Sequence, residues 1–315
     1  KCGMTLTLQS PITRQRGVTL IELLVGMTIG LLTIAVAMGA LMVSRGVSGT
    51  VSDATEIQQQ AAYAFRVIGG QLRQAGALRL NLAAQKPNTA TVDVADPVAF
   101  EVMPLPTDGS NPTLYGRDAP APSEYTLTVR FRDYIEPSFQ SATSVSLQRD
   151  CLGQMGVDSA NGINSPTSII ESQFVLFIDP LDATRRELRC RGGNGQIQPI
   201  LRNVANFQVR YLQQAAAGSG TPQIQYANAA AVGQPTAPGW SQVFGVEVCL
   251  VLYGNEPIDL PTGSTYTDCN GTTTVDMSNP LATDMNGSAI GPQRARRMHM
   301  VFRNIYQLRS QGQAG

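Results

Sequence analysis

Histidine and lysine are nearly missing from this chain. Its 315 residues include one histidine, His299, and of its 23 basic residues only Lys1 and Lys86 are lysines. A multi-histidine metal site, or a Ser-His-Asp triad with a spare general base, therefore lacks the residues it needs. The sequence also has no GxxxxGK(S/T) run, which excludes a P-loop for nucleotide hydrolysis. We expect a protein that is not an enzyme, with no catalytic residue, cofactor or metal site.

Net charge is missing as well. The 23 acidic and 23 basic residues cancel, which removes the global electrostatic argument for a nucleic-acid binder. Only 15% of the residues are charged and 43% are hydrophobic, a composition between that of a soluble globular protein and that of a chain with a membrane element.

One long stretch near the start carries no formal charge. It runs from Leu23 to Val43, and as a helix rising about 1.5 Å per residue it spans roughly the 30 Å core of a bilayer. Arg14 and Arg16 precede it, and Glu22 is the single acidic residue before it. The positive-inside rule predicts one membrane crossing, with the leading segment in the cytoplasm and the bulk of the chain exported.

The residues in front of this stretch carry a family resemblance. Gly17–Val25, GVTLIELLV, follows Arg14-Gln15-Arg16 and resembles the prepilin leader of type IV pilins and type II secretion pseudopilins. The resemblance implies that a prepilin peptidase removes a leader, residues 1–17, by cutting between Gly17 and Val18, and that Val18 is then methylated. Translation is expected to start at Met4. Val18 replaces the more usual phenylalanine.

Glu22 would be the fifth residue of the mature chain. A carboxylate in a membrane helix costs about 2.5 to 3.5 kcal/mol to insert, so such residues are usually functional. The resemblance implies that Glu22 pairs with the α-amine of Val18 on a neighbouring subunit. Alternatively, Glu22 lies at the headgroup level, where exposure removes most of the cost. Gly26 and Gly30 form a GxxxG pattern that either lets helices approach closely or reflects ordinary membrane-helix composition.

The helix is expected to continue beyond the membrane. No proline occurs between Pro11 and Pro87, and apolar residues recur every three or four positions. This stripe contains Ile57, Ala61, Ala64, Phe65, Ile68, Leu72, Ala75 and Leu78. We predict one helix from about Val18 to Leu80, softened at Gly46, Gly49 and Gly69-Gly70. Residues 18–45 would form the membrane and assembly helix, and residues 46–86 its amphipathic continuation.

Residues 87–315 are predicted to form a β-rich exported head. Alternating or apolar runs predict strands at Tyr125–Arg132, Ser168–Ile178, Thr184–Cys190, Asn206–Leu212, Val243–Tyr253 and Arg297–Leu308. The fold class is α+β, pilin-like, with a long N-terminal helix packed on an antiparallel sheet. Gln213–Gly239, rich in Ala, Gly and Gln, is expected to be a surface excursion outside the core. Asn255–Gln293 is a long turn-rich loop that either presents contacts or tolerates insertion.

Four cysteines remain once the leader, which contains Cys2, is removed. They are Cys151, Cys190, Cys249 and Cys269. An even number in an exported domain without a CxxC spacing favours disulfides over zinc. Of the three possible connectivities we favour Cys151 with Cys190 and Cys249 with Cys269, because each pair closes a local loop.

The carboxyl end is rich in arginine. Arg294, Arg296, Arg297, Arg303 and Arg309 follow the last acidic residue, Asp284. This pattern fits a solvated face of a strand, a contact with a partner pilin, or a patch for DNA phosphates.

A calcium site is a further alternative for the head. Asp179, Asp182 and Glu187 could supply its carboxylates, but no EF-hand pattern surrounds them.

Two more segments resemble one branch of the pilins. Phe65–Gly76 resembles the end of the helix in PilW-type minor pilins, and Arg303-Asn304 resembles their terminal strand. The resemblance implies a bacterial inner-membrane precursor with a periplasmic head. It would assemble with other minor pilins to initiate or cap a type IV pilus and would end in the fibre or at its tip. Its partners would be other minor pilins, the major pilin, the prepilin peptidase and the inner membrane, and nucleic acid is not expected among them. The alternatives are a type II secretion pseudopilin and a tip adhesin or DNA-uptake receptor.

Overall fold

The computed structural model describes residues 17–77, 80–81, 99–100, 109–110, 113–138, 141–146, 148–155, 169–182, 185–214 and 223–308. The predicted leader, apart from Gly17, lies outside these residues, as does Arg309. The chain divides into two compact units, residues 1–49 and 50–315, and the long helix α1 has residues in both.

Helix α1 covers Leu20–Gln74 without a break. The helix is therefore not interrupted at Gly46, Gly49 or Gly69-Gly70, where the sequence predicts that it is interrupted or softened. At Gly69 the missing side chain serves packing, because a Cβ there would collide with the ring of Tyr306. The predicted end at Leu80 is also wrong. Gly76 adopts a φ of 66° and donates its N–H to the carbonyl of Arg130 at 3.1 Å, which ends the helix early.

The predicted apolar stripe of α1 is confirmed in the head. Ile57, Ala61, Ala64, Ile68, Leu72 and Ala75 are each at most 3% exposed and share one core with both larger sheets. Phe65 is only partly buried against that core, and Leu78 lies outside the described residues. Gln71 fixes the helix further, because its Oε1 accepts a hydrogen bond from Ser172 on β7 at 2.8 Å.

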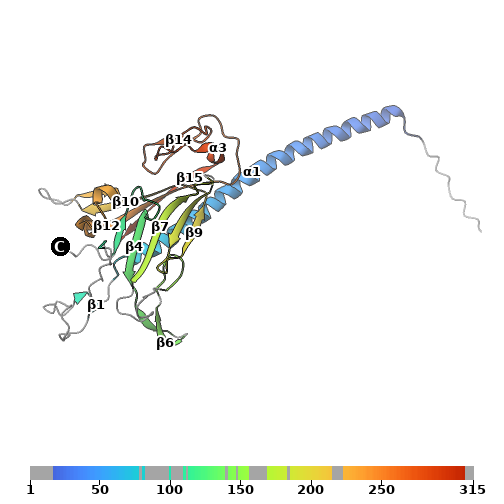
Figure 1. The fold of residues 1–315 in the computed structure, drawn as a ribbon. Coiled ribbons are helices and arrows are strands. Elements are labelled where there is room, and N and C mark those ends of the chain that lie inside the picture. Colours follow the sequence, from blue (N-terminus) through green and yellow to red (C-terminus); the bar gives the residue numbers. More distant parts are fainter. Residues whose placement is uncertain are drawn as a thin grey trace, which may run out of the picture. The chain divides into compact units, whose positions relative to one another are not determined.

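The head contains two larger antiparallel sheets where the sequence predicts one (Figure 1). The first has the order β3-β4-β7-β8-β9, with bounds Leu114–Gly116, Leu127–Arg132, Ile169–Ile178, Arg186–Arg191 and Ile197–Arg202. The second has the order β11-β10-β12-β15, with bounds Ile224–Ala227, Val204–Gln214, Val243–Tyr253 and His299–Gln307. The α+β class with antiparallel strands is confirmed.

Smaller elements complete the head. Two-stranded sheets pair β1 (Leu80–Asn81) with β2 (Ala99–Phe100), β5 (Ile135–Ser138) with β6 (Ser141–Ser146), and β13 (Thr265–Thr267) with β14 (Thr274–Asp276). The short helices are α2 (Ala229–Val232), the 3₁₀ helix η1 (Pro238–Gln242) and α3 (Gly291–Arg294).

The described part of Gln213–Gly239 is not the excursion that its composition predicts. Ala227, Ala229 and Val232 are buried in the main core. The cause is a long-range cap that adds to the N-cap Asn228, since the carboxylate of Asp118 accepts the N–H groups of Ala229 and Ala230 at 3.0 and 2.8 Å. This cap fixes the start of α2 and holds its apolar residues against the sheet.

Two disulfides secure the head. Cys151 is bonded to Cys190 on β8, and Cys249 on β12 is bonded to Cys269, which are the pairs that the sequence favours. The loops they close have sequence separations of 39 and 20 residues. By loop entropy each bond stabilises the head by about 3 to 4 kcal/mol.

The long segment Asn255–Gln293 builds a core of its own. Tyr266, Cys269, Val275 and Ile290 are buried together with Val251 and Tyr253 of β12. The segment is therefore a packed addition to the second sheet and is stapled to it by Cys249–Cys269.

Candidate functional site

The start of α1 is a capping box. The N–H and hydroxyl groups of Thr19 both donate to Glu22 Oε2, at 3.0 and 2.9 Å, and the N–H of Glu22 donates to the Thr19 hydroxyl at 3.4 Å. Thr19 thus occupies the position before the first helical residue and Glu22 the third helical position. The sequence analysis missed Thr19, although the pattern Thr-x-x-Glu before an apolar run predicts this box.

The predicted cleavage point directly precedes this box. Gly17 and Val18 lie before the first helical residue and are exposed, Val18 to 72%. The peptide bond between them is therefore outside the hydrogen-bonded helix.

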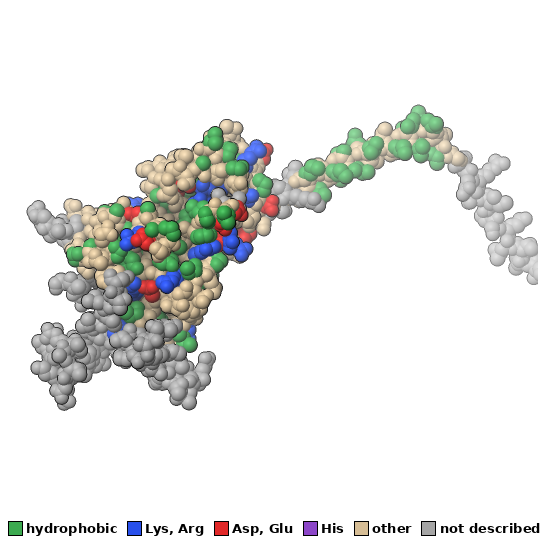
Figure 2. Space-filling view, viewed as in Figure 1, with side chains coloured by type: hydrophobic (Ala, Val, Ile, Leu, Met, Phe, Trp, Pro, Cys, Tyr) green, Lys and Arg blue, Asp and Glu red, His purple; other side chains and the backbone are tan. Residues whose placement is uncertain are grey.

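The surface of the following helix is apolar and exposed, and Figure 2 shows hydrophobic side chains along the face in view. Leu20–Met42 is the one helix in the described part of the chain that is long and apolar enough to cross a membrane, and none of it is buried. Its large apolar side chains are 51% to 77% exposed. A helix that is apolar all round belongs in a membrane or among other apolar helices.

Two details suit this surface to an apolar environment. The hydroxyls of Thr28 and Thr33 donate to the carbonyls of Val25 and Gly30 at 2.9 and 2.8 Å, so the helix satisfies them itself. Nothing lies within 4 Å of where a Cβ on Gly26, Gly30 or Gly39 would be, which leaves the helix backbone open to a neighbouring helix.

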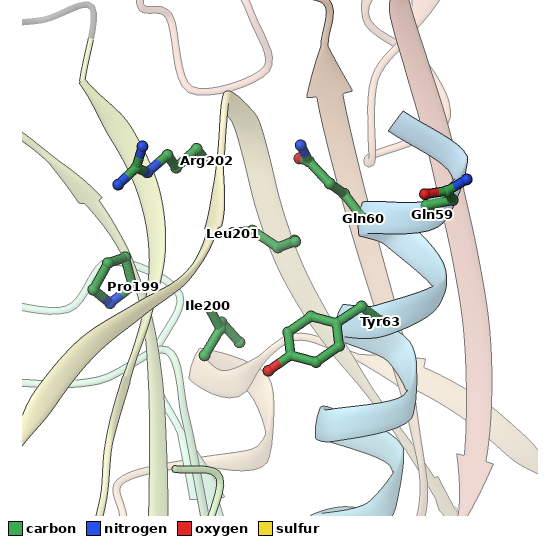
Figure 3. Close-up of a pocket in the computed structure, with 7 residues that line it drawn as sticks. All are labelled: Gln59, Gln60, Tyr63, Pro199, Ile200, Leu201 and Arg202. Carbon is green, nitrogen blue, oxygen red and sulfur yellow. The ribbon is translucent and has the colours of Figure 1, made fainter. Parts of the chain in front are cut away.

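The head has a groove beside α1. The groove has a volume of about 420 Å³ and lies between Gln59, Gln60 and Tyr63 of α1 and Pro199–Arg202 of β9. Figure 3 shows Tyr63 pointing from α1 toward Ile200. The lining offers amides, one phenol and one guanidinium, and no carboxylate, histidine or cysteine.

The predicted calcium alternative is not assembled. In the described part of the chain no three His, Cys, Asp or Glu side chains lie together as metal ligands. Glu187 accepts from Arg185 and Arg189 at 3.0 and 2.9 Å. Burial alone would raise the pKa of Glu187, but these two hydrogen bonds outweigh it and hold the pKa below its usual value.

The described carboxyl-terminal arginines differ in their surroundings, since Arg294 is buried while Arg296 and Arg303 are exposed. Arg294 is buried and pairs with Asp284 at 3.4 Å, so it is not part of a solvated strand face. Arg297 donates to the carbonyl of Gly254 at 3.1 Å, and Arg303 donates to that of Asp268 at 2.9 Å. The bond from Arg303 to Asp268 ties Asn255–Gln293 to β15.

The single histidine belongs to the same packing. His299 stacks on Tyr266 with ring centroids 4.8 Å apart, and it is 7% exposed. Burial lowers its pKa to about 4, so it is neutral near pH 7. Its surroundings are those of a core side chain, not of a general base.

Two family descriptions match the chain. "Prokaryotic N-terminal methylation motif" matches residues 12–38, which include Gly17, Val18 and Glu22. "Type IV Pilus-assembly protein W" matches residues 176–310, which include β8 to β15.

A solved structure, a type IV-like pilin from Thermus thermophilus, is similar at 12% identity, with 80% of this chain and 95% of that pilin covered and a TM-score of 0.31. No curated protein matches the chain. The two family matches confirm the resemblance to PilW-type minor pilins, and the chain is a type IV pilin-like protein with a PilW segment.

Proposed function

We propose that this chain is a minor pilin that assembles with other minor pilins to initiate or cap a type IV pilus. A prepilin peptidase removes residues 1–17, and residues 18–45 then hold the chain in the inner membrane with its head in the periplasm. The observation that carries this proposal is the exposed, apolar surface of Leu20–Met42, whose single charged residue is Glu22, directly after an accessible Gly17–Val18 bond. Such a surface would be buried in the lipid bilayer before assembly and against the apolar helices of neighbouring subunits in the fibre.

Cleavage would create the partner that Glu22 needs. The cut releases a positively charged α-amine on Val18, next to the only carboxylate of the apolar helix surface. In a filament the carboxylate is surrounded by apolar helices, where an unpaired charge is costly. The α-amine of a neighbouring subunit neutralises it, which fixes the axial position of one helix against the next.

Thr19 would act as a positioning residue in this step. Its N–H and hydroxyl groups hold Glu22 Oε2 at the amino end of α1, on the side of the helix where the new terminus lies. The other oxygen, Oε1, would then accept a hydrogen bond from the α-amine.

Recovery of partner pilins tests the proposal. The full chain is isolated from membranes with its neighbours, as wild type and as Glu22→Ala, Thr19→Val and Thr28→Val. We expect Glu22→Ala to lose most of its partners, Thr19→Val to lose some, and Thr28→Val, which removes only an intrahelical hydroxyl contact, to behave as wild type. Undiminished partner recovery with Glu22→Ala would remove the pairing role.

A strain that lacks this chain distinguishes the proposed role in a pilus from the alternative role in type II secretion. A minor pilin is required for surface fibres and twitching motility, whereas a pseudopilin is required for release of secreted proteins.

A further inference from the structure

The largest cavity described in the head lies between β7 of the first larger sheet and β10 of the second. Its volume is about 790 Å³, within the range of ligand sites. The lining includes the successive residues Val175–Ile178 of β7 and Asn206–Val209 of β10. Because successive side chains of a strand point to opposite faces, a cavity that touches four in a row lies at the edge of that strand.

Both edges are unpaired at these residues within the described chain. On its β4 side, β7 is paired only as far as Phe174, opposite Leu127. Beyond that point Val175–Ile178 pairs with β8 alone. On its β11 side, β10 is paired only from Tyr211 onward. Asn206–Val209 therefore pairs with β12 alone.

Side chains bridge the two sheets at each end of this cavity. At one end Arg186, which is opposite Ile178, donates to the carbonyls of Val204 and Ala205 at 3.1 and 2.7 Å. At the other end the hydroxyl of Tyr211 donates to the carbonyl of Thr126 at 3.4 Å. The two edges thus run in opposite directions along one slot, with one of these side-chain bridges near each of its ends.

The lining favours an uncharged occupant. Asp118 is its single ionisable side chain, and both of its oxygens already accept N–H groups of α2. Pro120, Pro122, Phe177 and Phe207 supply apolar surface. Gln208 adds a side-chain oxygen that is buried and has no hydrogen-bond partner in the described chain. A buried acceptor without a donor calls for one from elsewhere.

We propose that this slot receives an extended, uncharged segment of a partner polypeptide, which adds as a strand between β7 and β10. Its backbone would pair with one edge in the parallel sense and with the other in the antiparallel sense, and its apolar side chains would enter the space beside Phe177 and Phe207. Strand addition supplies affinity through main-chain hydrogen bonds. On the β10 edge the N–H of Phe207 already donates to Asn206 Oδ1 at 2.9 Å, so the partner strand would use the remaining main-chain groups. The proposal concerns the head alone and does not depend on the proposed pilin role.

A model peptide tests the slot directly. The probe is acetyl-Ser-Val-Thr-Val-Gln-Val-Ser-amide, added to the purified full chain in detergent micelles while amide hydrogen exchange is followed. We expect exchange in Val175–Ile178 and Asn206–Val209 to slow by at least about tenfold at saturation, with no change at the outer edge of β15. The control is the same peptide with N-methylated valines, which keeps the side chains but lacks those N–H donors, and it should give no protection.

Two variants separate the slot from the rest of the surface. Val175→Asp places a charge in the slot and should abolish the protection, whereas Ile197→Asp on the outer strand β9 should leave it intact. Equal protection by the N-methylated peptide, protection at β9 or β15 instead, or none up to millimolar peptide would overturn the proposal. The comparison of the two peptides uses the wild-type chain, so it decides the question even if Val175→Asp fails to fold.

Discussion

Two stretches of helix α1 differ in how far their apolar side chains are exposed. Between Leu20 and Met42 the large apolar side chains are exposed on all faces. Between Ile57 and Ala75 the helix buries one stripe whose members are each at most 3% exposed, while Tyr63, which is 44% exposed, and Gln58, Arg66 and Arg73 occupy other faces. The second stretch packs against the core of its own head, whereas the first needs an apolar surface that the described part of this chain does not provide. The difference separates a folding surface from an assembly surface.

The largest expected effect concerns the interior of the head. Arg294→Ala would leave the buried carboxylate of Asp284 without its cation, which should lower the free energy of unfolding by about 4 kcal/mol. The matched control is Arg296→Ala, whose partner Asp259 is 99% exposed, and it should change stability by less than about 1 kcal/mol. Denaturant unfolding of both variants measures the difference. Equal stability of the two would mean that Arg294 is solvated.

A pair of leucine substitutions tests the helix comparison itself. Leu72→Ala removes a fully buried side chain and should destabilise the head by about 3 kcal/mol. Leu32→Ala removes a side chain that is 68% exposed and should change head stability by less than about 0.5 kcal/mol. Thermal unfolding in detergent, followed in the near ultraviolet, reports both. A large effect of Leu32→Ala would erase the distinction between the two stretches.

A further expected effect, which appears only as the pH is lowered, is a pH dependence within the head. His299 has a pKa of about 4 when folded against an ordinary value of 6.5, so the unfolded chain binds the proton more readily between these values. Stability should therefore fall as the pH drops from about 6.5 to about 4, by up to about 3 kcal/mol, and this contribution should change no further below that. His299→Phe should remove this part of the pH dependence. Identical pH profiles for the two proteins would argue against a buried neutral imidazole.

The sequence predicted what depends on local period. The stripe from Ile57 to Ala75 follows from spacings of three and four, and the bounds of β12, Val243–Tyr253, follow from a long apolar run between turn residues. Capping was readable too, since Thr19 and Glu22 have the spacing of a capping box, but this signal was overlooked.

The features that the sequence did not predict depend on contacts between residues far apart in the chain. Nothing local shows that Asp118 would cap α2 and bury Ala229, which is more than a hundred residues away in the chain. The burial of Arg294 and His299 likewise depends on Asn255–Gln293 folding back over β15. The slot between β7 and β10 depends on which strands pair and where that pairing stops, which no single segment reveals.

Mass spectrometry of the chain purified from membranes tests most directly whether the exposed helix is kept for assembly. We predict a mature polypeptide that begins at Val18 and retains Leu20–Met42. A mature chain that begins after Met42, with the helix removed as an ordinary signal peptide would be, would contradict the account.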